Sequence, residues 1–303
     1  MRIVVFGGTG LLGWAIARAL RRNGHEVITA GRSACDEVVD FRYDTEPEAF
    51  ASLVHGADIV VNATGILIER GDNTFDAVHV KAPTALFAAC AKARVARIVH
   101  ISSLGVGTGI RGNYMATKLA AENALQAGCV DFAVVRPALL VDSDCPSTQL
   151  FQFLAKLPII ALPGLLHPGS AQLAPIHVQD VAHAVARICE HPKALRRVIE
   201  LGGPQTMSYR EMLAAYRQEA GKGAALWLPL PWWLMKLAAL LAAKLPQNVF
   251  SIDTMRMLEA GSVAPHSESS FWLRNMSGAV PQQQTIHPLS ALVDTNTGQM
   301  RGI

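Results

Sequence analysis

The sequence has little charge and no long basic run. Only 17% of its 303 residues are Asp, Glu, Lys or Arg, and the formal net charge is +3. A balance this weak, without a cluster of Lys or Arg, argues against nucleic acid as the main partner. Half of the residues are hydrophobic, so a buried core is easy to build and the composition is not that of a disordered chain.

Cysteine pairs and metal-binding spacings are also missing. The cysteines are scattered and none forms a CxxC pair, which fits reduced thiols in a cytosolic protein; they are Cys35, Cys90, Cys129, Cys145 and Cys189. The ten histidines show no HxxxH spacing with a third ligand, so we expect no metal. The apolar run before the first glycines is too short for the core of a signal peptide, and we expect a cytoplasmic protein.

Short apolar runs of strand length alternate with helical segments through the first two thirds of the chain. The expected strands are residues 3–6, 27–30, 38–40, 58–63, 97–102 and one within 132–141. The expected helices are 12–23, 74–93, 113–126, 178–190 and 209–219. Apolar strands separated by helices predict a parallel sheet covered on both faces, an α/β fold of the doubly wound Rossmann type.

After residue 142 the alternation loosens and prolines become frequent, which predicts a small C-terminal substrate lobe. The expected division is a Rossmann domain over 1–142, to which 176–200 returns, and a lobe built from 143–175 and 201–265. Residues 266–303 are rich in Ser, Gln, Thr and Asn, and we expect an irregular tail there. The substrate cleft would lie between the lobe and the sheet.

A glycine-rich turn follows the first strand. It consists of Gly7, Gly8, Thr9, Gly10, Leu11, Leu12 and Gly13, and it satisfies both GxxGxxG and GxGxxG. Glycine permits the tight turn and a close backbone approach to a pyrophosphate, and the helix start offers free N–H groups and its dipole. The pattern alone is weak, but a strand before it and an amphipathic helix after it favour dinucleotide binding over a purely structural turn.

The end of the second strand bears on which nicotinamide nucleotide is bound. An acidic residue there would bind the ribose 2′-hydroxyl of NAD, but the segment reads Thr-Ala-Gly-Arg-Ser and contains no acid. Arg32 occupies the place of a 2′-phosphate, which a guanidinium grips through two hydrogen bonds. We therefore expect NADP(H) to be preferred over NAD(H). The alternative is that Arg32 is a solvated surface residue.

Two further strand ends are candidate cofactor contacts, because ligands bind at the carboxyl ends of strands in this architecture. Asp40 and Phe41 close the third strand and are candidates to line an adenine pocket. The fourth strand ends in a segment expected to lie above the cofactor: Asn62, Ala63, Thr64 and Gly65.

A YxxxK motif, Tyr114 to Lys118, begins a predicted helix and places both side chains on one helical face. The reference pKa of tyrosine is near 10, too high for acid–base work at neutral pH, and a nearby ammonium lowers it. Lys118 is also a candidate to hold the nicotinamide ribose. Ser103, at the mouth of the fifth strand, is placed to hold a substrate carbonyl oxygen. Chance YxxxK matches are common, and it is the sequence context that favours a catalytic set.

Together these residues resemble the short-chain dehydrogenase/reductase superfamily, in particular its extended and atypical NAD-dependent epimerase/dehydratase-like branch. The resemblance covers about residues 1–264 and also rests on Arg136-Pro137 and on the segments 175–182 and 201–204. Within that branch the sequence is similar to bacterial homologues of the nucleotide-binding accessory subunit of respiratory complex I, through residues 62–67, 75–80 and 201–204. NmrA-like NADP-binding regulators are the group that the sequence resembles next.

The superfamily resemblance implies catalytic roles for Ser103, Tyr114 and Lys118. The same resemblance implies that five residues lie beside the cofactor: His79, Ser102, Lys118, Arg136 and Pro137. The complex I resemblance implies instead a bound NADP(H) that stabilises the protein without catalysis.

Two positions depart from the superfamily pattern. His79 stands where a catalytic Asn is usual, and we consider a proton relay, a structurally satisfied helix histidine and a cofactor contact as its roles. After Arg136-Pro137-Ala138 the chain reads Leu-Leu-Val-Asp rather than a Tyr-Gly-Pro type loop. That difference weakens the case for a nucleotide-sugar epimerase or dehydratase.

The stretch 224–245 is unusually apolar for a soluble enzyme. Pro229, Pro231, Lys236 and Lys244 interrupt it, which leaves an expected helix over about 231–244 with tryptophans near its start. Tryptophan favours membrane interfaces, so one interpretation is peripheral contact with the cytoplasmic face of a membrane. The other is a lid helix of the lobe or a homodimer contact. Either way, we expect an apolar small-molecule substrate.

Two functional hypotheses follow. The first is an NADP(H)-dependent oxidoreductase on a carbonyl or alcohol, in which Tyr114 is the acid/base, Lys118 lowers its pKa and Ser103 orients the substrate oxygen. The second is a non-catalytic NADP(H)-binding sensor, or an accessory or assembly factor of a membrane complex.

Overall fold

The computed structural model describes residues 1–164, 170–235, 237 and 251–273. Its centre is a seven-stranded sheet in the order β11-β6-β5-β4-β1-β2-β3, with every neighbouring pair parallel. The strands are β1 (Arg2–Phe6), β2 (Glu26–Gly31), β3 (Glu37–Val38), β4 (Ile59–Asn62), β5 (Arg97–Ile101), β6 (Asp131–Pro137) and β11 (Arg197–Leu201). The doubly wound α/β fold predicted from the sequence is confirmed.

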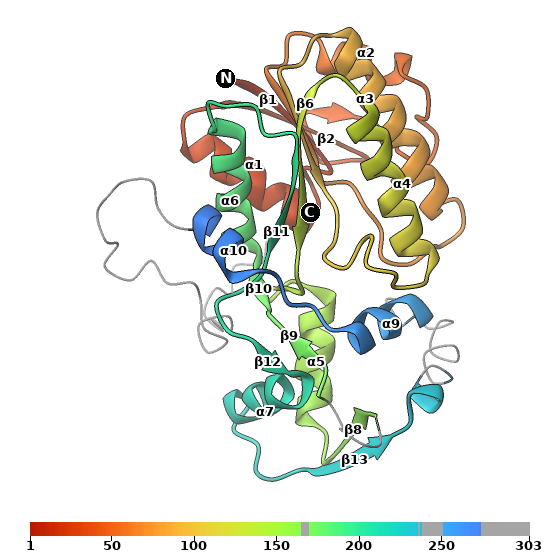
Figure 1. Ribbon diagram of the computed structural model, residues 1–303, viewed down its shortest axis with the longest axis vertical. Helices are drawn as coiled ribbons and strands as arrows, with labels where there is room; N and C mark the ends of the chain where they lie inside the picture. The colour runs from red at the N-terminus through yellow and green to blue at the C-terminus, as the bar shows by residue number, and fades with distance from the viewer. Residues whose placement is uncertain (165–169, 236, 238–250, 274–303) are drawn as a thin grey trace.

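Helices cover both faces of this sheet (Figure 1). One face carries α1 (Leu11–Arg22), α6 (Val178–Glu190) and α10 (His266–Leu273), and the other carries α2 (Glu48–Val54), α3 (Ala82–Lys92) and α4 (Asn113–Ala127). Each face has its own apolar core, because the central strands are apolar on both sides. The segment 176–200 thus supplies α6 and β11 to the sheet domain.

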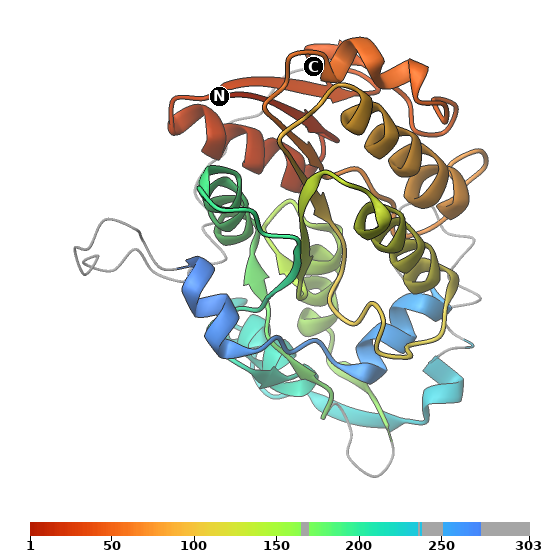
Figure 2. The same ribbon diagram turned by 45° about the horizontal axis from the view of Figure 1, so that its top comes forward.

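A smaller lobe lies beyond the carboxyl ends of the strands (Figures 1 and 2). Its helices are α5 (Pro146–Lys156), α7 (Tyr209–Glu219) and α9 (Ile252–Ala260). Three two-stranded sheets complete it: β7 (Leu140–Val141) with β10 (Ile176–His177), β9 (Gln172–Leu173) with β12 (Met207–Ser208), and β8 (Ile159–Pro163) with β13 (Leu226–Leu230). Its core is built mainly from α5, α7 and α9.

A wide helical turn precedes α3. Residues Asp76–Lys81 form a π-helical turn, η1, that runs directly into α3. Pro83, in the first turn of α3, has no N–H and cannot bond to the carbonyl of His79 four residues earlier. The widened turn is the local consequence, and it sets the direction in which His79 points.

Three boundaries differ from the sequence-based expectation. The third strand is Glu37–Val38, so Asp40 lies in the loop beyond it rather than at its end. The prediction of an irregular tail is wrong for 266–273, which form α10 with Trp272 buried against α6. Part of the apolar stretch forms β13, with the following residues 232–235 helical. Most of the expected helix 231–244 lies outside the described residues, as does the rest of the tail from 274. No helix within the described ranges is long and apolar enough to cross a membrane.

Candidate active site and cofactor cleft

The glycine turn between β1 and α1 is packed too closely for any side chain. A Cβ at Gly13 would lie 2.1 Å from the carbonyl oxygen of Gly7, and one at Gly8 would lie 2.7 Å from the Cβ of Thr29. Gly7 also has a φ of +74°, which disfavours any residue with a Cβ. These contacts hold the start of α1 against the carboxyl end of β1, where Thr9, Leu11 and Leu12 complete the turn.

The N-terminus of α1 fits a bound anion. Gly10, its N-cap, has no side-chain cap, and the first turn of the helix holds no acidic residue. The first N–H groups of a helix lack partners within the helix and carry a partial positive charge. Across the turn, the buried Oγ1 of Thr64 has no hydrogen-bond partner among the described residues. The open helix end and this orphaned hydroxyl are the features that a dinucleotide lying over Gly7–Gly13 would satisfy.

The loop after β2 keeps Arg32 exposed at the end of the cleft. The acidic residue nearest to this strand end, Asp36, turns back to accept hydrogen bonds from the N–H and hydroxyl of Thr29 at 2.8 and 2.7 Å. Those bonds are the main reason that the pKa of Asp36 lies below its usual value. Asp36 is therefore committed to the strand, while Arg32 is exposed just after the end of β2.

The expected adenine-pocket pair is split by the structure. The Asp40 carboxylate is paired with the guanidinium of Arg42, whose hydrogen bonds are the largest cause of its lowered pKa, and Arg32 adds to the effect. Phe41 is buried in the core between Phe6 and Phe50, with ring centroids 5.9 and 5.5 Å away. The prediction that Phe41 lines the adenine pocket is wrong, because the aromatic ring is used to fill the core beside β1.

The end of β4 approaches the YxxxK helix through Gly65. A Cβ there would lie 3.1 Å from the Nζ of Lys118, which would have to shift by a few tenths of an ångström. Asn62 is fully buried, with its amide nitrogen 3.2 Å from Nδ1 of His100 and its oxygen accepting the N–H of Thr64. Asn62 thus shapes the turn, while Ala63, Thr64 and Gly65 form the edge of the cleft.

His79 is held on both ring nitrogens by the protein. Its Nε2 accepts the backbone N–H of Ile66 at 3.0 Å, and its Nδ1 lies 3.2 Å from the hydroxyl of Thr117. Burial lowers the pKa of His79 to about 2, so the ring stays neutral at physiological pH. Of the three roles considered, these contacts favour the structurally satisfied histidine. It ties the loop after β4 to the helix that carries Tyr114.

Tyr114 and Ser103 face the same cavity. The Tyr114 ring packs edge-on against Phe75 and His79, with centroids 5.8 and 5.5 Å away, which fixes the direction of its hydroxyl. Burial raises the pKa of Tyr114, and its contact with the Ser103 side chain acts in the opposite direction. The YxxxK motif predicts that Lys118 lowers the pKa of Tyr114, but Lys118 is not among the groups that shift it.

Lys118 is buried beneath the cleft. Its Nζ donates a hydrogen bond to the carbonyl of Ile101 at 3.1 Å. Burial lowers the pKa of Lys118 to about 8, against an opposing attraction from Glu122. The amine is close to Gly65, at the level where the nicotinamide ribose is expected, and it remains mostly charged at pH 7.

Ser102 and Arg136 belong to a polar network behind the site. Glu122 is fully buried; it accepts a hydrogen bond from the Ser102 hydroxyl at 2.5 Å and two from Arg136 at 3.0 and 2.6 Å. Arg136 also reaches Glu200 at 3.3 Å. Both side chains are engaged with Glu122, and their contact with a cofactor stays a prediction. Ser102 and Pro137 also line the substrate cavity.

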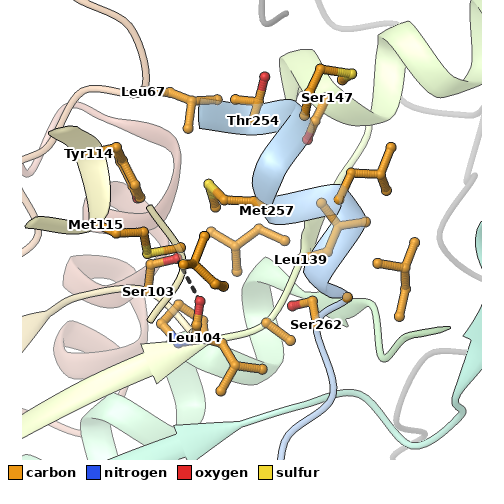
Figure 3. A pocket seen from close by; sticks show the side chains of 18 of the residues that line it. Leu67, Ser103, Leu104, Tyr114, Met115, Leu139, Ser147, Thr254, Met257 and Ser262 are labelled. Carbon is orange, nitrogen blue, oxygen red and sulfur yellow. Dashed lines mark hydrogen bonds between the residues drawn. The ribbon is translucent and has the colours of Figure 1, made fainter. Parts of the chain in front are cut away.

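An apolar cavity of about 280 Å³ opens beside Tyr114 and Ser103 (Figure 3). α5 and α9 form the wall opposite these two residues. Among the described residues, the side chains that line the cavity include no Asp, Glu, Lys, Arg or His. They are chiefly aliphatic, among them Leu67, Ile110, Met115, Leu139, Phe151, Met255 and Met257, with hydroxyls from Ser147, Thr254 and Ser262 at the margin. The described residues also bring together no group of His, Cys, Asp and Glu that would hold a metal ion.

Residues 3–202 match one protein family, described as the NAD dependent epimerase/dehydratase family. The chain belongs to this family. As a family member it is an NAD(P)-binding Rossmann protein, and the superfamily resemblance carried by the glycine turn and YxxxK is confirmed.

The names of two curated relatives of this epimerase/dehydratase-family protein describe different functions. It is 31% identical over 201 residues to "Ceramide reductase" of Caulobacter vibrioides, a match covering 63% of this chain and 61% of that protein. It is 24% identical to the mitochondrial "NADH dehydrogenase [ubiquinone] 1 alpha subcomplex subunit 9" of Arabidopsis thaliana, covering 97% of this chain and 78% of that subunit. The similarity to complex I subunits predicted from the sequence is therefore confirmed.

Solved structures of similar fold include an NADPH-dependent quinone oxidoreductase from Escherichia coli complexed with NADPH. It has a TM-score of 0.71 at 17% identity and covers 90% of this chain and 94% of its own. A UDP-glucuronic acid 4-epimerase from Bacillus cereus in complex with NAD has a TM-score of 0.63 at 18% identity, covering 76% and 87%. At these identities the likeness shows the fold of this family member.

The far wall of the cavity is built from residues that no sequence motif marks. Phe151 of α5 and Met255 of α9 line it, yet neither segment carries a motif. Proline at the first position of α5 and the Ser251–Thr254 pair at the start of α9 were readable helix signals. They predict helices but give no sign of what those helices cover.

Proposed function

We propose that this protein is an NADP(H)-dependent reductase of an apolar carbonyl compound. The proposal rests on the cavity. Ser103 and Tyr114 lie on one side of it, and the described side chains around them are uncharged and mainly aliphatic. A nucleotide sugar brings a diphosphate that needs cationic partners, and the described residues that line the cavity include no cationic side chain. Its volume is near the lower limit of about 300 Å³ for ligand pockets, which suits a small apolar molecule.

The residues at the cavity match the work that carbonyl reduction requires. The nicotinamide, when bound, supplies hydride to the carbonyl carbon. The Ser103 hydroxyl holds the carbonyl oxygen, and Tyr114 donates a proton to that oxygen as its negative charge develops. A raised pKa keeps the Tyr114 phenol protonated at neutral pH, which is the form needed for reduction. The ammonium of Lys118 lies beneath the cleft to bind the ribose.

A panel of carbonyl compounds tests the proposal. With NADPH oxidation followed by absorbance, kcat/KM is expected to rise on the order of 100-fold from 2-butanone to 2-octanone, because each buried methylene contributes about 0.8 kcal/mol. UDP-glucuronic acid and UDP-glucose should give no turnover. Conversion of either nucleotide sugar, or a flat dependence on chain length, would contradict the assignment.

Arg32 is proposed to select NADP(H). Replacing it with Ala removes the charged side chain at the end of β2, and a hydrogen bond to a charged group contributes about 1.5–3 kcal/mol. The Kd for NADPH, measured by titration calorimetry, should therefore rise roughly 10- to 100-fold, while the Kd for NADH stays unchanged. Arg22→Ala, at the exposed end of α1, is the matched control and should change neither. An equal loss for both nucleotides would show that Arg32 does not read the phosphate.

We also propose that the tip of the lobe contacts a membrane surface. The large exposed apolar side chains of the β8–β13 sheet, which we call the apolar tip, are Ile159, Leu226 and Leu228. Further exposed apolar residues of the lobe are Phe153, Trp233 and Leu237. The described residues of this region, 145–164 and 220–235, include no Asp or Glu but do include Lys156 and Lys222. An apolar face with a cationic, acid-free border suits an anionic lipid surface.

Vesicle sedimentation tests this contact. Binding to vesicles containing phosphatidylglycerol should exceed binding to phosphatidylcholine alone, and Leu228→Glu should reduce it about tenfold. Val38→Glu, on an exposed apolar residue of β3 at the edge of the seven-stranded sheet, is the control and should have no effect. If vesicles are not bound and light scattering shows a dimer that Leu228→Glu separates, a second copy covers the tip instead.

The alternative function is a non-catalytic NADP(H)-binding accessory or sensor protein. Its support is the 97% coverage of this chain by the match to the Arabidopsis complex I subunit, together with a His79 that is fully engaged in structure. Tight NADPH binding without oxidation across the whole ketone panel would favour this alternative.

A further inference from the structure

Two helices meet end to end at a single carboxylate. The helix that carries Tyr114, α4, begins at a Gly112 N-cap, which supplies no side chain to cap the first N–H groups. The missing cap comes from the lobe: Oδ2 of Asp253 accepts the backbone N–H of Tyr114 at 3.0 Å, across 139 positions of sequence. A cap on the second residue of a helix is the usual work of an N-cap Asp, performed here by another element.

The fit at this junction depends on Gly112. A Cβ on that residue would lie 2.4 Å from Oδ1 of Asp253, closer than any real contact. Gly112 also has a φ of +151°, a conformation that residues with a side chain rarely adopt. The backbone before Tyr114 and the Asp253 carboxylate are therefore in direct contact because glycine stands between them.

Electrostatics explains why an acid occupies this place. Asp253 lies in the first turn of α9 as well as at the start of α4, and each helix N-terminus carries a partial positive charge. Two such ends repel one another, and a carboxylate between them attracts both. Arg256, at 3.6 Å, is more exposed than Asp253 and pairs with it from the solvent side.

α9 is also a wall of the substrate cavity. Thr254, Met255 and Met257 line that cavity, and Met257 packs against the cluster formed by Phe75 and Tyr114. The element that bounds the substrate is thus fastened to the first turn of the helix that carries the proton donor.

We propose that Asp253 is a positioning residue that fastens α9 to α4, and so holds the cavity wall and Tyr114 in register. This inference rests on the proposed reductase function. Asp253 touches neither substrate nor cofactor, and acts through the Tyr114 backbone and through the helix it anchors.

Steady-state kinetics with 2-octanone and NADPH tests the effect on the site. Asp253→Ala should lower kcat about tenfold and raise the KM for the ketone, with the Kd for NADPH unchanged. Asp253→Asn keeps an acceptor oxygen and should recover most of kcat. Arg256→Ala removes the solvent-side partner of Asp253 and a 3.4 Å hydrogen bond to the carbonyl of Arg111, but it leaves the bond from Asp253 to Tyr114, and it is expected to stay near wild type. If kcat is unchanged in Asp253→Ala, measured below the melting temperature of that variant, Asp253 has no positioning role.

Hydrogen exchange tests the contact without any turnover. The amide of Tyr114 should exchange at least about tenfold faster in Asp253→Ala than in the wild-type protein, and Gly112→Ala should produce the same change by displacing the carboxylate. The double variant should add little to either single one, since both break one contact. If the wild-type protein reduces no ketone, the proposed function falls while this measurement still decides the anchor: unchanged exchange in both single variants overturns it.

Discussion

Replacing Tyr114 with Phe is expected to reduce ketone turnover by about 10²- to 10⁴-fold, the usual contribution of a positioned general acid. The substitution removes only the hydroxyl that faces the cavity. The ring that packs against Phe75 and His79 is retained, so the fold and the start of α4 should be unaffected. Because the hydroxyl acts on the substrate oxygen, kcat should fall far more than the affinity for NADPH. Single-turnover measurement of NADPH oxidation checks the step directly.

A second tyrosine provides the control for this result. Tyr216 is buried in the lobe core, away from the cavity lining, and Tyr216→Phe also deletes a buried hydroxyl. That variant should keep full activity. If Tyr114→Phe retains more than about a tenth of wild-type turnover, Tyr114 is not the proton donor, and the case for the non-catalytic alternative strengthens.

The sheet domain could be predicted because its signals are local. A buried parallel strand is a short apolar run, and the glycine turn, α1 and the stop at Gly24 follow one another within a few residues. The helices Val178–Glu190 and Tyr209–Glu219 have the predicted bounds, since apolar residues recur at helical spacing in both. The helix 266–273 was missed because its composition is polar, and the burial of Trp272 against α6 is a tertiary effect.

The site was harder to predict because position near a strand end does not determine the direction of a side chain. Phe41 follows β3 and Arg136 lies near the carboxyl end of β6, yet one fills the core and the other pairs with the buried Glu122. The partners that decide these outcomes, Phe50 and Glu122, lie on neighbouring helices and have no motif of their own. The contact of Asp253 with Tyr114 is the extreme case, since nothing local links residues so far apart in the sequence.

The glycine turn gives the other large expected effect. Gly13→Ala would place a methyl group 2.1 Å from the Gly7 carbonyl oxygen, and the nearest atoms are backbone that has no free room to move. The start of α1 must therefore shift away from β1, which misaligns the N–H groups that face the pyrophosphate. We expect the Kd for NADPH to rise at least about 100-fold, a loss of roughly 2.7 kcal/mol. Titration calorimetry measures it.

Gly24→Ala separates this effect from a general loss of stability. Gly24 closes the other end of α1 with a φ of +81°, and a Cβ there would meet nothing within 4 Å. Alanine should therefore strain the backbone and lower the free energy of unfolding by about 1 kcal/mol while leaving NADPH affinity intact. Gly13→Ala, unlike Gly24→Ala, should lose affinity for NADPH even under conditions in which the protein remains folded. Equal affinities in the two variants would mean that the turn is structural only, and the dinucleotide would have to be held elsewhere along the cleft.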